Sequence, residues 1–90
     1  MFSWQQKKCL KHICELQEGE KGKIVQIRGK AAEHRYLSIL GIAVGQDIFV
    51  EKIVNTSRDR IITIATSDID VTLDRTLTQN IQVEVPVVSS

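Results

Sequence analysis

The chain has 90 residues, of which 42% are hydrophobic, and a formal net charge of +1 from 12 Lys and Arg against 11 Asp and Glu. This length forms one domain with a single modest core and is too short for a catalytic cleft between domains. The near-neutral charge disfavours electrostatic binding of nucleic acid. No apolar run approaches the ~20 residues that span a bilayer, and the first 20 residues lack a signal-peptide core, so we expect a cytosolic protein.

The N-terminal stretch predicts a short helix. Ser3 can serve as the N-cap with Gln6 at N3, which makes a capping box, and the helix would run from Trp4 to about Cys14. Phe2 and Trp4 stand beside a lysine-rich stretch. Two interpretations follow: a terminal helix that closes one end of the fold, or a surface that rests on a membrane or a partner.

Cys9, His12 and Cys14 have a spacing that suggests a metal site, and His34 is the remaining candidate for a fourth ligand. On a helix of about 100° per residue, however, Cys14 lies about 140° from Cys9 and about 200° from His12, so the three side chains diverge. Three ligands also fall short of the four in a structural zinc site. We therefore expect no bound metal and no cofactor, and we expect free thiols in a reducing cytosol.

Short runs rich in β-branched residues and bounded by turn residues predict a mainly β fold. Five strands are expected, at 21–28, 46–54, 60–66, 68–74 and 81–85. One helix, at 31–40, separates the first two strands. Pro86 ends the last strand because it has no N–H to donate, and Asp68 and Asp70 alternate outward as solubilising charge rather than as a cation site.

The sharpest local signal is an elbow that joins the helix to the second strand. Leu37 and Leu40 share one helix face, and Gly41 follows where a left-handed residue closes a helix without steric cost. Ile42 can then pack back on Leu37, as in a Schellman ending. Gly45 takes the third position of the next turn, where a type II turn needs a positive φ.

This elbow, preceded by Glu15-Leu16 and Glu18-Gly19-Glu20, resembles the core pattern of the FeoA family, small accessory proteins of bacterial ferrous iron transport. The resemblance covers roughly residues 13–85. It implies a small, partly open SH3-like barrel of about five strands with one internal helix, to which the sequence adds the short N-terminal helix. The expected division is an N-terminal helical extension at 1–12, the FeoA-like domain at 13–85 and a tail at 86–90.

The resemblance also implies a function. A FeoA-like protein is expected to be a non-enzymatic cytosolic accessory protein that binds and modulates the membrane iron transporter FeoB, and this partner could hold it at the inner face of the membrane. Consistent with this, the sequence holds no Gly-rich phosphate loop before a helix and no catalytic Ser-His-Asp or Cys-His spacing. We hypothesise that His34, Arg35 and Ser38, on the exposed side of the helix, contact the partner.

Two alternatives remain open. Residues 19–29 resemble the opening of a KOW-type module, which would make the protein an RNA- or ribosome-binding barrel. Such a barrel should interleave basic residues with aromatics, and the chain has only four aromatic residues. FeoA-like barrels also occur in iron-dependent repressors, so the second alternative is a metal-responsive regulatory domain that works with a separate repressor.

Overall fold

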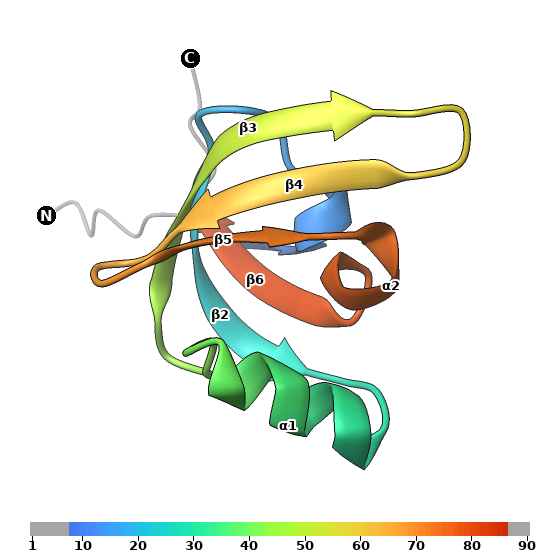
Figure 1. Ribbon diagram of the computed structural model, residues 1–90. Helices are drawn as coiled ribbons and strands as arrows, with labels where there is room; N and C mark the ends of the chain where they lie inside the picture. The colour runs from blue at the N-terminus through green and yellow to red at the C-terminus, as the bar shows by residue number, and fades with distance from the viewer. Residues whose placement is uncertain (1–7, 87–90) are drawn as a thin grey trace, which may run out of the picture.

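The computed structural model describes residues 8–86 as one curved, six-stranded antiparallel sheet with two short helices (Figure 1). Its order across the sheet is β1-β6-β2-β3-β4-β5. The elements are β1 (Lys8–His12), a 3-10 turn η1 (Ile13–Glu15), β2 (Lys21–Ile27), α1 (Ala31–Ile39), β3 (Asp47–Asn55), β4 (Arg60–Ala65), β5 (Asp70–Leu73), α2 (Arg75–Thr78) and β6 (Ile81–Pro86). Helix α1 lies across one end of the sheet, and the β3–β4 hairpin extends from the other end (Figure 1).

The sheet closes around a core because alternate side chains of its strands are apolar and point to the same side. The buried apolar side chains are Ile13, Leu16, Ile24, Leu37, Ile42, Ile48, Val50, Ile62, Ile64, Leu73, Ile81, Val83 and Val85. In β6, for example, buried and half-buried positions alternate up to the exposed Pro86. The predicted mainly β, SH3-like fold is therefore confirmed, with six strands in place of about five.

Two glycine turns frame the central pair of strands, β2 and β3. Gly19 precedes β2 with φ +89° and Gly45 precedes β3 with φ +96°. The N–H of Gly19 donates to the carbonyl of Val50 at 2.8 Å, and the N–H of Gly45 donates to the carbonyl of Ile24 at 2.8 Å. Each turn is thereby anchored to the strand that the other turn introduces.

The predicted N-terminal helix is wrong over the described residues. Lys8 to His12 forms β1, an edge strand paired with β6, and only Ile13–Glu15 makes a single 3-10 turn. The strand is favoured over a helix here because it extends the sheet along β6 and lets the side chain of Ile13 enter the core. The earlier part of the predicted helix, with Phe2 and Trp4, lies outside the described residues.

The division at 1–12, 13–85 and 86–90 stays a prediction, although β1 belongs to the same sheet as the rest of the domain. Within residues 8–86, no helix is long and apolar enough to cross a membrane.

The close approach of β2 to β6 gives a test of the packing. A Cβ on Gly22 would lie 3.2 Å from the carbonyl oxygen of Glu84 and 3.2 Å from Cβ of Val83. We expect Gly22→Ala to lower the free energy of unfolding by about 1–3 kcal/mol in urea titration, because neither neighbour belongs to a flexible side-chain end. The adjacent exposed change Lys21→Ala is the control, and equal losses for the two variants would contradict this packing.

Candidate functional site

Helix α1 rests on the barrel through very few side chains. Leu37 is buried, with 1% of its surface exposed, and Leu40 packs partly buried against the core. At the other end of the helix, the N–H of Lys30 donates to Oε1 of Glu33 at 2.9 Å, and Nδ2 of Asn80 lies 3.4 Å from the other oxygen of the same carboxylate. Two ends and one buried stripe therefore hold the helix, and most of its surface faces solvent.

The elbow after α1 has the hydrogen bonds of a Schellman ending. The N–H of Ile42 donates to the carbonyl of Leu37 at 2.9 Å, and the N–H of Gly41 donates to the carbonyl of Ser38 at 3.0 Å. Gly41 has φ +89°, and the side chain of Ile42 is buried. This ending sets the direction in which the chain leaves α1.

The side chain of Gln46 braces the elbow from within. Its Nε2 donates to the carbonyl of Gly41 at 2.6 Å, and its Oε1 accepts from the N–H of Ala43 at 3.0 Å. On the opposite side, a Cβ on Gly41 would come within 3.1 Å of Cδ1 of Ile69, at the β4–β5 turn. The two Gln46 bonds fix the path of the chain from Gly41 to Ala43, which favours a fixed orientation of α1.

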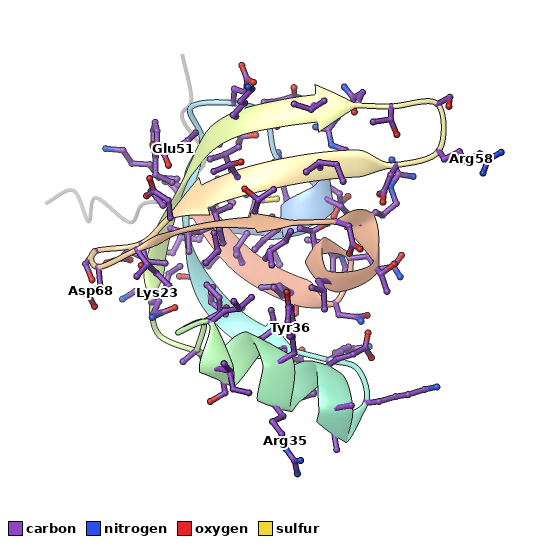
Figure 2. All side chains as sticks on the ribbon, viewed as in Figure 1. Lys23, Arg35, Tyr36, Glu51, Arg58 and Asp68 are labelled. Atoms are coloured by element: carbon purple, nitrogen blue, oxygen red, sulfur yellow. The ribbon has the colours of Figure 1, made fainter. Side chains whose placement is uncertain are left out.

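The outward surface of α1 mixes one charge with large apolar groups. Leu37, Leu40 and the half-buried Glu33 define the inward side, so at about 100° per residue Arg35 lies near the outward pole. Figure 2 shows Arg35 pointing away from the barrel and Tyr36 pointing back toward it. We call the exposed residues of the helix and the turn after it the helix–elbow face: His34, Arg35, Tyr36, Ser38, Ile39 and Val44.

The three residues predicted from the sequence to contact a partner, His34, Arg35 and Ser38, all lie exposed on this face. Tyr36 and Ile39 also lie on this face, and sequence reasoning missed them as site residues. Tyr36 is 51% exposed and Ile39 is 76% exposed. Helix geometry predicts the exposure of Ile39, because this residue lies about 160° around the helix from the buried Leu37. Exposed large apolar side chains beside a cation are typical of protein-binding surfaces.

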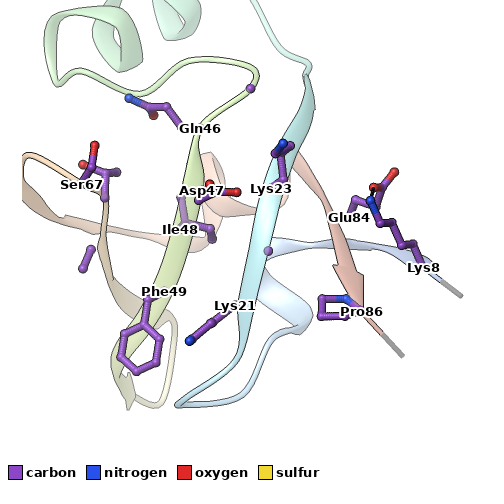
Figure 3. Close-up of a pocket in the computed structure, with 14 residues that line it drawn as sticks. Lys8, Lys21, Lys23, Gln46, Asp47, Ile48, Phe49, Ser67, Glu84 and Pro86 are labelled. Carbon is purple, nitrogen blue, oxygen red and sulfur yellow. Dashed lines mark ion pairs between the residues drawn. The ribbon is translucent and has the colours of Figure 1, made fainter. Parts of the chain in front are cut away.

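Apart from the helix–elbow face, the protein has a groove on the outer face of the sheet (Figure 3). This groove has a volume of about 850 Å³ and runs over β2 and β3. Lys8 and Glu84 form an ion pair of 3.0 Å at one side, and Phe49 stands on the other. Its lining residues are Lys8, Lys21, Gly22, Lys23, Gly45, Gln46, Asp47, Ile48, Phe49, Ala65, Thr66, Ser67, Glu84 and Pro86.

The residues considered as metal ligands do not come together. Cys9 pairs with Val85 and His12 with Gln82, three positions apart on β1, so their side chains project from opposite faces of the sheet. Cys14 lies in η1. Among residues 8–86, no three His, Cys, Asp or Glu side chains are placed to hold a metal ion.

Glu15 governs the local electrostatics around η1. Its carboxylate accepts from the backbone N–H of His12 at 2.8 Å and lies 3.2 Å from Nδ1 of the same residue. These contacts hold the pKa of Glu15 below its usual range. Burial, reinforced by the nearby Glu15 carboxylate, raises the pKa of the Cys14 thiol. A protonated thiol is a poor metal ligand and a poor nucleophile.

Comparison with known protein families decides the classification. The FeoA domain model matches residues 11–85. The chain belongs to the FeoA domain family. Family membership supports an accessory role in ferrous iron transport for this FeoA-domain protein. A separate comparison with curated protein sequences found no match.

Solved FeoA structures share the fold. A crystal structure of an iron uptake regulatory protein (FeoA) is 22% identical, with a TM-score of 0.72 over 86% of this chain and 97% of that one. The NMR structure of a FeoA-like protein from Clostridium acetobutylicum is 22% identical, with a TM-score of 0.73 over 88% of this chain and 90% of that one. At this identity the likeness concerns the fold.

A regulator also contains this fold. A manganese-dependent transcriptional repressor is 20% identical, with a TM-score of 0.77 over 90% of this chain and 44% of the repressor. The FeoA-domain chain therefore spans less than half of that protein.

The elbow yields a stability prediction. Gly41→Val places a β-branched residue at φ +89° and its Cβ against Ile69, so we expect a loss of about 1–2 kcal/mol or more in the free energy of unfolding. Gly41→Asn, which tolerates a left-handed backbone better, should lose less. Chemical denaturation of both variants tests this. A Gly41→Val variant as stable as the parent protein would refute the elbow geometry.

A second prediction concerns pH. Because the folded-state pKa of Glu15 is lowered, its contribution to stability is present above the unfolded-state pKa and is lost as pH falls through the folded-state value. We expect the stability difference between the parent protein and Glu15→Gln to shrink between about pH 5 and pH 3. Denaturation at a series of pH values measures it, with Asp68→Asn, a change at an exposed carboxylate in the β4–β5 turn, as the control. A difference independent of pH would rule out the ionic part of this contact.

Proposed function

We propose that this FeoA-domain protein is a non-enzymatic accessory protein of ferrous iron uptake that binds the cytosolic G-protein region of the membrane transporter FeoB. The family match supports the transport role, and the helix–elbow face supports a mechanism through protein contact. The protein would act from the cytoplasm, at the inner face of the membrane, without taking up metal itself. Modulation of FeoB then depends on a surface rather than on a reaction.

The observation that carries the choice of surface is the exposure of Ile39, at 76%, on a helix in which Leu37 is the one fully buried side chain. A large apolar side chain in water gains free energy when a partner covers it, roughly in proportion to the area removed from water. Arg35 lies next to Ile39 on the outward side and supplies a planar guanidinium that recognises carboxylates. A partner surface with an apolar pocket and a nearby acidic group fits this pair.

The rigidity of the elbow supports the same assignment. The Schellman bonds from Gly41 and Ile42 and the brace from Gln46 hold α1 in one orientation before any partner binds. A preorganised surface loses little conformational entropy on association, so more of the contact energy appears as affinity.

The prediction is that charge reversal or polarity at this face weakens transporter binding and spares the fold. Arg35→Glu and Ile39→Asp should each weaken binding to the purified cytosolic region of FeoB at least about tenfold, as expected for centrally placed contact residues. Calorimetry or surface plasmon resonance measures the affinity, and thermal unfolding verifies that both variants remain as stable as the parent protein.

The matched control is Arg58→Glu, the same charge reversal at an exposed position in the β3–β4 turn, away from α1 (Figure 2). Unchanged affinity for both test variants would move the contact surface elsewhere on the protein. Absence of any binding by the parent protein would remove FeoB as the partner.

A regulatory role is the second candidate, since the fold recurs in a manganese-dependent transcriptional repressor. In that case the chain would work with a separate DNA-binding protein. A pull-down from native cytosol and membrane, with the parent chain as bait, separates the two: recovery of a transporter supports the first function, and recovery of a repressor supports the second.

A further inference from the structure

Strand β1 is one edge of the sheet, and its pairing with β6 determines which of its backbone groups face outward. Adjacent pairs in an antiparallel ladder alternate between those that exchange hydrogen bonds and those that do not. Lys8 is opposite Pro86, which has no N–H, so this pair is of the non-bonded kind. By alternation, Leu10 and His12 also direct their backbone N–H and carbonyl groups away from β6.

An independent contact supports this assignment. The N–H of His12 donates to Oε1 of Glu15 at 2.8 Å, which an N–H occupied by β6 would not do. Glu15 thereby caps the His12 end of the edge. By the same alternation, the N–H and carbonyl of Leu10 both point away from β6, and the carbonyl lies 3.9 Å from the thiol of Cys9. Leu10 therefore presents a nearly unused donor and acceptor at the open edge.

The side chains of β1 give this edge one exposed apolar group and two positive charges. Leu10 is 56% exposed. Lys8 and Lys11 project from opposite faces of the strand and pair with Glu84 at 3.0 Å and Glu20 at 3.9 Å. Such partly exposed ion pairs contribute little stability, so both lysines can exchange partners at small cost.

We propose that β1 accepts an extended acidic segment of a partner protein as an added antiparallel strand. The partner's backbone would complete the hydrogen bonds of Leu10, and its acidic side chains would lie opposite Lys8 and Lys11. Because these lysines are three residues apart, four consecutive residues of the partner strand are defined. Read from its N-terminal side, they are an acidic residue opposite Lys11, an apolar residue opposite Leu10, any residue, and an acidic residue opposite Lys8. This surface is separate from the helix–elbow face.

A second copy of the chain fits the edge less well. Antiparallel pairing of β1 with itself about Leu10 would bring two lysines from each copy onto one ladder of five residues. In that register Lys8 would lie opposite His12 and Lys11 opposite Cys9 of the other copy, so neither lysine would gain an acidic partner, and lysine on an edge strand is a common protection against such pairing. The same lysines favour an acidic strand.

The probe is the peptide acetyl-Thr-Glu-Val-Thr-Glu-Thr-amide, added to the full isotope-labelled chain. We expect NMR shift changes centred on residues 8–12 and an amide exchange rate at Leu10 slowed at least about tenfold at saturation, since that N–H becomes hydrogen-bonded. Two control peptides should fail to bind: one with Lys in place of both Glu residues, and one methylated on the Val nitrogen, which removes the donor to the Leu10 carbonyl.

Variants of the protein complete the experiment. Lys8→Glu and Lys11→Glu should each weaken peptide binding about fivefold, and Leu10→Pro should abolish the Leu10 bond without removing a bond to β6. Arg35→Glu should bind the peptide normally, which separates this proposal from transporter binding at α1. The proposal is overturned if the peptide leaves residues 8–12 unaffected, if either control peptide binds equally well, or if the Leu10 amide becomes protected merely by raising the protein concentration.

Discussion

The mutual anchoring of two glycine turns on strands β2 and β3 is the constraint on which the rest of this FeoA-domain structure depends. Gly19 and Gly45 are 26 residues apart, and each donates to the strand introduced by the other turn. Val50 returns a hydrogen bond to the carbonyl of Glu20 at 2.9 Å, and Ile24 returns one to Gln46 at 2.9 Å. The same local device thus closes both ends of the central pair and sets its register. The elbow of α1 leads directly into the second of these turns, so the register also orients the helix.

The consequence for function is a division between a closed interior and an exposed helix. The strands fill the core with branched aliphatic side chains, whereas α1 commits only Leu37 fully to it. A helix fastened by its ends can present Arg35 and Ile39 without the fold depending on them. Binding residues on such a helix are free to differ while the elbow residues Gly41 and Ile42 keep its orientation. The proposed strand addition at β1 depends instead on unpaired backbone groups. The helix–elbow face and the β1 edge are therefore two proposed binding surfaces of distinct chemistry.

Local rules were sufficient where short-range geometry decides structure. The elbow from Leu37 to Gly45 was predictable because a helix ending and a type II turn each require one residue with positive φ. Arg35 and Ser38 were predictable as exposed because helix periodicity places them about 160° and 100° from Leu37, whereas His34, only about 60° away, was expected to be exposed because it is polar. The same periodicity also exposes Ile39, although its side chain is apolar. The prediction of an N-terminal helix failed because a capping pattern is a weak preference, and pairing with β6, whose paired residues lie 70 to 78 positions later in the chain, outweighed it.

The sequence by itself determined the β-rich class, the place of the helix, the elbow and the family pattern, since each follows from the spacing of apolar residues and from glycines at turns. Only the tertiary structure decided that Lys8–His12 is an edge strand, that Cys9 and His12 face opposite ways, and that Leu10 directs its backbone outward. These features depend on which strand lies beside which and in what register. Register is set by long-range packing of the complete core, and no local segment carries that information.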